Sequence, residues 1–324
     1  MTMHKHQKSN LDLFWVVVFS FFVFNLVIFV RDAASSCFSF IPYGYNGEYS
    51  HLPSERDFCY FFGGKKVYMQ TSGQSGRYIG TGALNNITAF GESQLLGMDW
   101  SDRNEKYPHD LTRILKNKNI TIFAAPNNGP LQSYNQMKFL IQNKTVKSND
   151  IIIGFNFGTD IFRVDPLWDP DNFIPLTSTD LVRIFKIPFY HDLMLAAARI
   201  QGKYFGSNVG NSKSIRKHYF SKNFSHRLTH VRTWLSRIKE LQKTVSNKFK
   251  IIIFPPYWYL GSENAEKKNI EADYQTLICS IHKSKVFDVI HISKLNFNSF
   301  DMAYDERHFK TGALDIVISD TCQR

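Results

Sequence analysis

Two segments far apart in this 324-residue chain carry residue types that could act together as a nucleophile and a base. Ser93 follows a short apolar run at 87–90, where a strand would pass through a turn into a helix. A serine in that position exposes its hydroxyl at the carboxyl end of a strand, near the N–H groups of the helix. Asp305 lies three residues before His308, so its carboxylate can accept the Nδ1–H of the imidazole and leave Nε2 as a base. Together these residues favour nucleophilic catalysis, although a lone serine is more often a helix cap.

Four segments, in this order along the chain, resemble the sequence blocks of the SGNH/GDSL hydrolase family. The segments are Gly91-Glu92-Ser93-Gln94, Asn127-Asn128-Gly129 with Ser133, the run from Asp150 to Asp160, and Asp305-x-x-His308. The resemblance covers about residues 66 to 320 and implies a flavodoxin-like α/β fold with a parallel sheet between helices. It also implies acyl transfer by a triad of Ser93, Asp305 and His308, with no metal and no organic cofactor.

The resemblance further implies an oxyanion hole, and the chain departs from the family pattern there. The expected donors are the backbone N–H groups of Ser93 and Gly129 and one side chain from the third block. Thr159 stands where the family has its asparagine, and Asn156 lies three residues earlier. Either side chain can donate a hydrogen bond, so both are candidates. A second departure is Glu92, which replaces the family's usual aspartate and adds one methylene.

Apolar runs that alternate with helical patterns predict the elements that would position these residues. The runs lie at 66–70, 87–90, 120–124, 151–157, 251–254 and 286–292, and the helical patterns lie at 111–115, 134–141, 228–245 and 314–318. The runs at 151–157 and 251–254 are apolar on both faces, as in strands buried within a parallel sheet. The alternation predicts a doubly wound parallel sheet with right-handed crossovers, and the stretch 162–249 should hold two or three helices.

The N-terminal segment predicts a transmembrane helix. Residues 13–30 carry no charge and would rise about 27 Å as a helix, close to the hydrocarbon thickness of about 30 Å. Lys5 and Lys8 precede the segment, so the positive-inside rule predicts a cytoplasmic N-terminus and a periplasmic or extracellular domain on the inner (plasma) membrane. Cleavage within 32–36 is the alternative. The chain then divides into a cytoplasmic tail (1–10), an anchor (11–30), a spacer (31–64) and a hydrolase-like domain (65–324).

The formal charge of +11 is concentrated in one window. Between residues 201 and 250 there are twelve basic residues and one acidic residue, Glu240, so this window accounts for the whole excess. Such a patch can attract an anionic glycan or an anionic membrane, and a solvated helix face is the alternative.

The four cysteines favour disulfides over a metal site. No two of them form a C-x-x-C pair, so zinc is not expected. Cys37 with Cys59, and Cys279 with Cys322, could form disulfides outside the cytoplasm, and buried free thiols are the alternative.

A single anchor with an external domain resembles enzymes that add or remove O-acetyl groups on bacterial glycans. The expected partners are an acylated polysaccharide and a membrane acyl-donor protein, and no nucleic acid is expected. Tyr257 and Trp258 could form a platform for sugar rings, or simply pack at the domain edge. Arg163 could bind a substrate carboxylate or pair with Asp165. Hydrolysis and transfer share one acyl-serine, so both stay open. A lipid or thioester hydrolase and a non-catalytic glycan-binding or assembly protein are the alternatives.

Overall fold

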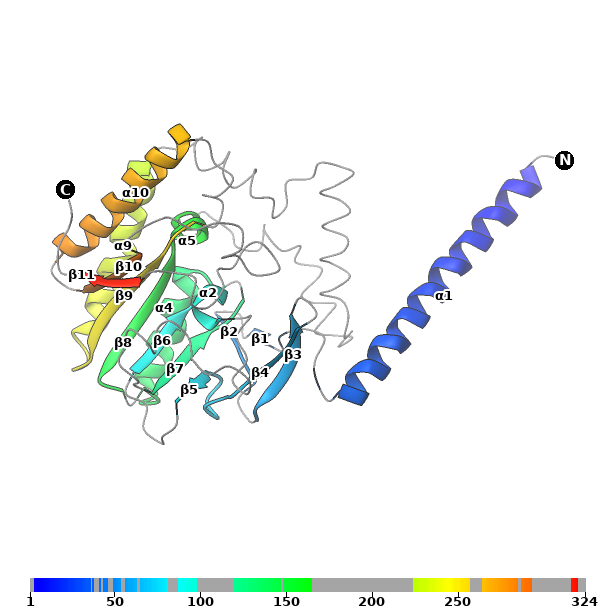
Figure 1. Ribbon diagram of the computed structural model, residues 1–324, viewed down its shortest axis with the longest axis horizontal. Coiled ribbons are helices and arrows are strands. Elements are labelled where there is room, and N and C mark those ends of the chain that lie inside the picture. Colours follow the sequence, from blue (N-terminus) through cyan, green and yellow to red (C-terminus); the bar gives the residue numbers. More distant parts are fainter. Residues whose placement is uncertain are drawn as a thin grey trace.

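A seven-stranded sheet lies at the centre of the computed structural model (Figure 1). The strand order is β11-β10-β9-β8-β6-β7-β5, with five parallel inner strands and two antiparallel edge strands. The strands are β5 (Arg77–Ile79), β6 (Ile87–Gly91), β7 (Ile120–Ala124), β8 (Asp150–Asn156), β9 (Lys248–Phe254), β10 (Asp288–Ile292) and β11 (Ile316–Ser319). The structure describes residues 3–35, 37, 41, 43–45, 49–53, 56–62, 65–80, 87–97, 119–126, 128–146, 148–164, 224–256, 264–284, 287–292 and 316–319.

The inner strands are buried on both faces. Every residue of β6, β7 and β8 is buried, and the side chains of Ile151, Ile152 and Ile153 are at most 1% exposed. Parallel strands require crossover connections that cover the sheet, so they are apolar on both sides. This burial confirms the predicted α/β class with a parallel sheet.

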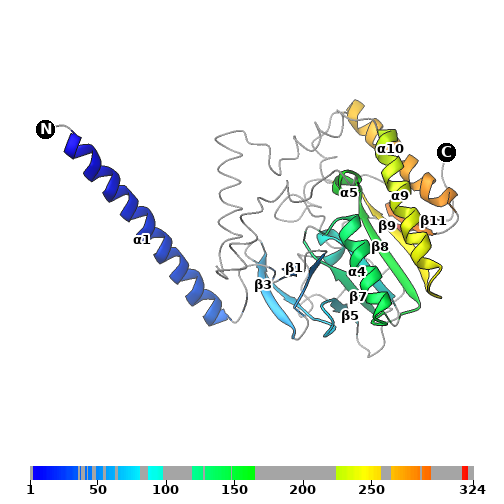
Figure 2. The same cartoon turned by 180° about the vertical axis from the view of Figure 1, so that it is seen from behind.

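Three helices lie side by side along the sheet (Figure 2): α4 (Pro130–Gln142), α9 (Phe224–Gln242) and α10 (Asn264–Lys283). The chain moves from β7 to β8, to β9 and to β10 in one direction, so right-handed crossovers place these helices on one face. Trp234 of α9 donates its indole N–H to the carbonyl of Pro130 in α4 at 3.0 Å. The Tyr274 hydroxyl of α10 donates to the carbonyl of Ile253 in β9 at 2.9 Å. The first bond joins two neighbouring helices, and the second joins a helix to the sheet.

The structure corrects two sequence predictions. The segment that contains 314–318 was expected to form a helix, but Ile316–Ser319 form strand β11, which pairs with β10. Three consecutive β-branched residues, Ile316, Val317 and Ile318, fit an extended strand better than a helix. The run at 66–70 is a strand, β4 (Lys65–Met69), but among the described residues it pairs with β3 (Phe58–Phe62) in a separate two-stranded sheet and not with the central sheet. The helical pattern at 111–115 lies outside the described residues.

The N-terminal part begins with α1 (Met3–Ser35), whose apolar side chains from Leu13 to Leu26 are largely exposed. Among the helices of the described residues, none combines the length and the apolarity needed to cross a membrane. The transmembrane anchor therefore stays a prediction.

The segment expected to be a spacer contains short strands and buried side chains. It holds β1 (Gly44–Tyr45) and β2 (Ser50–His51), and the side chains of Leu52 and Tyr60 are completely buried in the core. Cys37 and Cys59 form a disulfide, as the sequence suggested. Cys279 is disulfide-bonded as well, and Cys322 lies outside the described residues.

Candidate active site

A polar cluster lies at the carboxyl ends of β6 and β8, where the sheet changes its winding direction. From β6 the chain continues to β7 on one side of β6, whereas from β8 it continues to β9 on the other side. In doubly wound sheets the carboxyl ends at such a switch point border a crevice in which ligands bind. Ser93 follows β6, Gly129 follows β7 and Asn156 ends β8, so three of the predicted site residues lie at this edge.

Two glycines allow a short helix to seat directly on this edge. The helix α2 (Ser93–Leu96) begins immediately after β6, and its residue Leu95 is completely buried. A Cβ added to Gly91 would lie 2.7 Å from Cδ2 of Leu95, and one added to Gly154 would lie 3.1 Å from the same atom. The missing side chains of Gly91 and Gly154 therefore make room for Leu95, which fixes the start of α2 and with it Ser93.

Ser93 is the first residue of this helix and is not its cap. Glu92 occupies the N-cap position with an extended backbone, and its side chain makes no capping hydrogen bond. Gly97 ends the helix with a left-handed backbone at φ 66°, a conformation that favours glycine. The helix-cap alternative for Ser93 is thus not what the structure shows.

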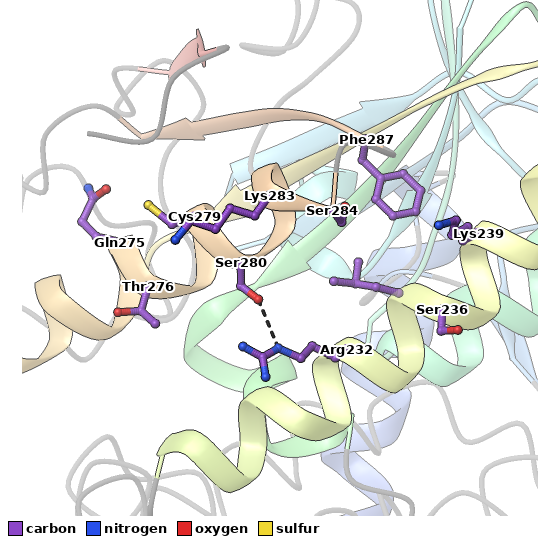
Figure 3. A pocket seen from close by; sticks show the side chains of 11 residues that line it. Arg232, Ser236, Lys239, Gln275, Thr276, Cys279, Ser280, Lys283, Ser284 and Phe287 are labelled. Atoms are coloured by element: carbon purple, nitrogen blue, oxygen red, sulfur yellow. Dashed lines mark hydrogen bonds between the residues drawn. The ribbon is translucent and has the colours of Figure 1, made fainter. Parts of the chain in front are cut away.

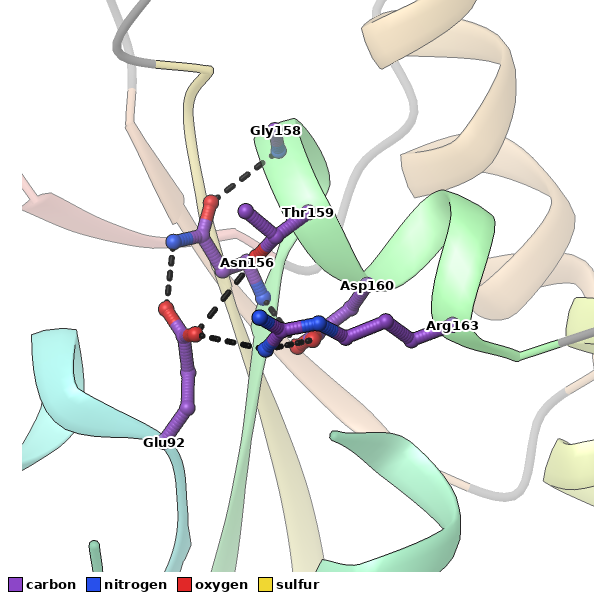
Figure 4. Close-up of polar contacts among 6 residues, drawn as sticks. All are labelled: Glu92, Asn156, Gly158, Thr159, Asp160 and Arg163. Carbon is purple, nitrogen blue, oxygen red and sulfur yellow. Dashed lines mark hydrogen bonds and ion pairs between the residues drawn. The ribbon is translucent and has the colours of Figure 1, made fainter. Parts of the chain in front are cut away.

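The carboxylate of Glu92 organises the cluster (Figure 4). Its Oε1 accepts a hydrogen bond from Nδ2 of Asn156. Its Oε2 accepts from the Thr159 hydroxyl at 3.5 Å and pairs with Nη1 of Arg163 at 3.4 Å. Glu92 is 5% exposed, so these interactions take place with little water. One buried carboxylate therefore holds side chains of β8 and α5 (Phe157–Arg163) beside Ser93.

The Asn156 amide is held at both ends. Its Oδ1 accepts a hydrogen bond from the N–H of Gly158 at 3.0 Å, which caps α5. Its Nδ2 donates to Glu92, and an amide nitrogen has a second hydrogen that remains for another acceptor. The hydroxyl of Thr159 has only one hydrogen, and that hydrogen points to Glu92.

Asp160 places a second carboxyl group in the same cluster. It is 1% exposed, and its Oδ2 accepts a hydrogen bond from the N–H of Asn156 at 2.8 Å. Its Oδ1 lies 4.0 Å from Nη1 of Arg163 and has no hydrogen-bond partner among the described residues. Burial, and then the negative charge of Glu92, raise the pKa of Asp160 well above its ordinary value, against the opposing effects of Arg163 and the Asn156 N–H. One guanidinium thus serves two carboxyl groups.

The stem of Arg163 connects this cluster to the start of α4. Gly129 is the N-cap residue of α4 and is followed by Pro130. A Cβ added to Gly129 would lie 3.2 Å from Cβ and Cδ of Arg163. The Arg163 side chain therefore passes over Gly129 before its head reaches Glu92, so it contacts the second predicted oxyanion block as well as the third.

The predicted site residues fall into two groups. Gly129, Asn156, Thr159 and Arg163 are described and belong to one cluster around Glu92, and Ser93 is the residue that follows Glu92. The remaining predicted residues lie outside the described residues, and so does the alternative Arg163 partner Asp165; they are Asp305, His308, Tyr257 and Trp258.

Sequence reasoning missed two features of the cluster. Asp160 was part of the third block but received no role, although its spacing of four from Asn156 puts the carboxylate over the start of α5. Glu92 was noted only as a departure from the aspartate of the family. The clue to both was the presence of three charged residues, Glu92, Asp160 and Arg163, shortly after two largely apolar strands.

The described residues contain no group of three or more His, Cys, Asp or Glu side chains that could hold a metal ion. The groups that the described site does contain are a serine hydroxyl, an amide, backbone N–H groups and one arginine–carboxylate cluster.

The fold and the site together define a doubly wound α/β protein with a polar site at its switch point. No family model and no curated protein matches the chain. Among solved structures, the psychrotrophic esterase EstA from Pseudoalteromonas sp. aligns with a TM-score of 0.34 and 10% identity, over 71% of this chain and 90% of the esterase. The lipase Lip_vut3 from a goat rumen metagenome aligns with a TM-score of 0.36 and 13% identity, over 69% of this chain and 90% of the lipase. Likenesses with such low TM-scores carry no argument about fold or activity.

Proposed function

We propose that this chain is an SGNH-type serine ester hydrolase or acyltransferase with Ser93 as its nucleophile. The observation that supports this most directly is the hydrogen bond from the Asn156 amide to Glu92, the residue immediately before Ser93. It holds a polar donor from the end of β8 against the segment that follows β6, at the switch point of the sheet. A buried amide with a spare hydrogen beside a serine is suited to a developing oxyanion.

In the proposed reaction, the Ser93 hydroxyl attacks the carbonyl carbon of an ester, and His308 takes the hydroxyl proton. The carbonyl oxygen becomes an oxyanion, which then collapses to an acyl-serine while His308 returns the proton to the departing alcohol. Asp305 accepts the Nδ1–H of His308 and stabilises the charged imidazolium. Water or an acceptor hydroxyl then attacks the acyl-serine and loses its proton to His308; as the bond to Ser93 breaks, the acyl group leaves as the free acid or the new ester, and His308 returns the proton to the Ser93 oxygen.

The proposed oxyanion hole consists of the N–H groups of Ser93 and Gly129 and the amide of Asn156. We prefer Asn156 to Thr159, because the single hydroxyl hydrogen of Thr159 is already directed at Glu92. The Gly129 N–H donates no hydrogen bond within the described part of the chain, so it is open to a ligand. One lost donor of this kind costs on the order of 3 kcal/mol of transition-state stabilisation.

The proposed substrate is an O-acyl group, most simply O-acetyl, on a glycan outside the cytoplasm. The Cys37–Cys59 disulfide and the disulfide-bonded Cys279 support an oxidising compartment. The long N-terminal helix with exposed apolar side chains supports attachment to the plasma membrane, with the enzyme domain periplasmic or extracellular. A membrane acyl-donor protein would be the partner if transfer is the reaction.

The test is covalent labelling of the full chain with a fluorophosphonate, followed by peptide mapping and by turnover of 4-nitrophenyl acetate. Labelling should occur at Ser93, and Ser93→Ala should lower turnover by at least about 10³-fold while unfolding at the wild-type temperature. Ser246→Ala, at an exposed position before β9, is the matched control and should behave like wild type. Labelling that persists in Ser93→Ala would refute the assignment.

A further inference from the structure

A cavity of about 750 Å³ lies between α9 and α10 (Figure 3). Its lining from α9 extends from Arg232 to Lys239, and its lining from α10 begins at Gln275. These stretches run from about the middle of each helix toward its end, and Phe287 lines the cavity just before β10 begins. Both helices run antiparallel to the strands, so their second halves lie toward the amino edge of the sheet. The cavity therefore lies toward the edge opposite to Ser93 and is distinct from the candidate active site.

The cavity is lined by three cations, Arg232, Lys239 and Lys283. Within the described residues, Lys239 and Lys283 have neither a hydrogen bond nor an ion pair, and Arg232 bonds only through Nε to the Ser280 hydroxyl, at 3.3 Å. No acidic residue is among the described residues of the lining. The neighbouring acid on α9, Glu240, pairs with Lys243 at 2.7 Å and so does not neutralise the cavity. Uncompensated positive charge in a concave surface attracts anions more strongly than the same charge on a convex surface.

The remaining lining is suited to a carbohydrate. Hydroxyls of Ser236 and Ser280 can donate and accept hydrogen bonds, as sugar hydroxyls do, and that of Ser284, which donates to the Ile281 carbonyl at 2.6 Å, can accept them. Leu235 and Phe287 also line the cavity, and with exposures of 6% and 5% they form its apolar floor. The volume is within the range of cavities that hold small ligands. A flat membrane surface would not enter a groove between two helices, and its lipid phosphates do not require these hydroxyls.

We infer that this cavity, the α9–α10 groove, binds a short acidic segment of an oligosaccharide and so holds a polymer at a distance from the reacting ester. The inference rests on the proposed function in one respect: the polymer that binds in the groove is taken to be the acylated substrate. Binding itself requires only the groove, so it is measured without catalysis.

The experiment uses the full chain carrying Ser93→Ala, in detergent micelles, and isothermal titration calorimetry. The probes are an oligogalacturonate, a heparin-derived oligosaccharide and a neutral maltodextrin of the same length. We expect at least one acidic probe to bind, with an affinity that falls as salt rises, and the maltodextrin not to bind. Lys239→Glu and Lys283→Glu should each weaken binding about fivefold or more, because each reverses a charge inside the groove.

The matched control is Arg237→Glu, which reverses an exposed charge on the same helix outside the groove lining. It should change the affinity by less than about twofold. Equal losses of affinity in Arg237→Glu and Lys239→Glu would show that a diffuse basic surface binds the probes, and would overturn the inference. The inference would also fail if neither acidic probe bound, or if maltodextrin bound as tightly as the acidic probes. In the chain that retains Ser93, Lys239→Glu and Lys283→Glu should turn over 4-nitrophenyl acetate at the wild-type rate. A chain that binds the probes but lacks esterase activity would refute the proposed function without contradicting the inference about the groove.

Discussion

Glu92 and Asn156 are 64 positions apart in the chain, yet the Glu92 carboxylate accepts a hydrogen bond from the Asn156 amide. Both residues are at most 5% exposed, so the bond joins the ends of β6 and β8 in a site with little water. A charged acceptor makes this bond stronger than one between neutral groups. The bond orients the Asn156 amide and uses only one of the two hydrogens on Nδ2. Four expectations follow from this cluster and from the disulfide.

The first expectation is that Glu92 acts on catalysis through Asn156. Asn156→Ala should lower kcat for an acetyl ester by about 10²- to 10³-fold, and Glu92→Ala by about 10- to 100-fold, with KM nearly unchanged in both. The double variant should be no slower than Asn156→Ala alone, because the two residues act as one unit. Thr159→Ala is the control and should lose less than about threefold. Losses that simply multiply in the double variant would show that Glu92 does not act through Asn156.

The second expectation concerns the balance of charge around Arg163. Arg163→Met removes the one cation that pairs with both Glu92 and Asp160 and leaves two buried carboxyl groups together. Because Arg163 is 15% exposed, we expect a loss of about 2–3 kcal/mol in the free energy of unfolding, below the cost of breaking a fully buried pair. Urea unfolding would measure it. Adding Asp160→Asn should restore part of the loss, and a double variant no more stable than Arg163→Met would contradict this account.

A third expectation follows from the raised pKa of Asp160, whose causes are burial first and then the charge of Glu92. An acid with a raised folded pKa binds its proton more tightly in the folded state, so its contribution to stability is complete below the unfolded pKa of about 3.9. That contribution is lost as the pH rises from there through the folded pKa. The stability of wild type relative to Asp160→Asn should therefore fall between acidic and neutral pH in urea unfolding. Asp288→Asn, at an exposed position, is the control and should not show this trend; a relative stability of wild type that rises with pH would have the wrong sign.

The fourth expectation is that the Cys37–Cys59 disulfide stabilises the segment that precedes the central sheet in the chain. It closes a loop of 22 positions, which corresponds to about 3 kcal/mol in the chain-entropy account. The double variant Cys37→Ser with Cys59→Ser should lose roughly that free energy of unfolding. A mild reductant should lower the free energy of unfolding of wild type toward that of the variant. The same reductant should lower that of the variant less. Equal stability of the variant and the oxidised wild type would show that the bond does not constrain the unfolded chain.

Local patterns in the sequence predicted most of the described central fold. The apolar runs at 87–90, 120–124 and 151–157 are the inner strands β6, β7 and β8, and the pattern at 228–245 is largely helix α9. These predictions succeeded because the period of an apolar pattern and the burial of a parallel strand are local properties of a few consecutive residues. The position of Ser93, Gly129 and Asn156 at strand ends also followed from the sequence, since parallel strands share one carboxyl edge.

The tertiary structure alone decided which polar side chains meet at that edge. Substrate and Asp165 were the expected partners of Arg163 and stay untested; the fold adds contacts that the sequence did not suggest, of its head with Glu92 and of its stem with Gly129. These contacts depend on the strand order β8-β6-β7, which brings segments 64 and more positions apart within hydrogen-bonding distance. For the edge strand β11, the β-branched run was a local signal for a strand, but its partner β10 is set by a long-range contact. A sequence specifies the preference of each element, whereas the partners across the sheet are selected only when the whole core packs.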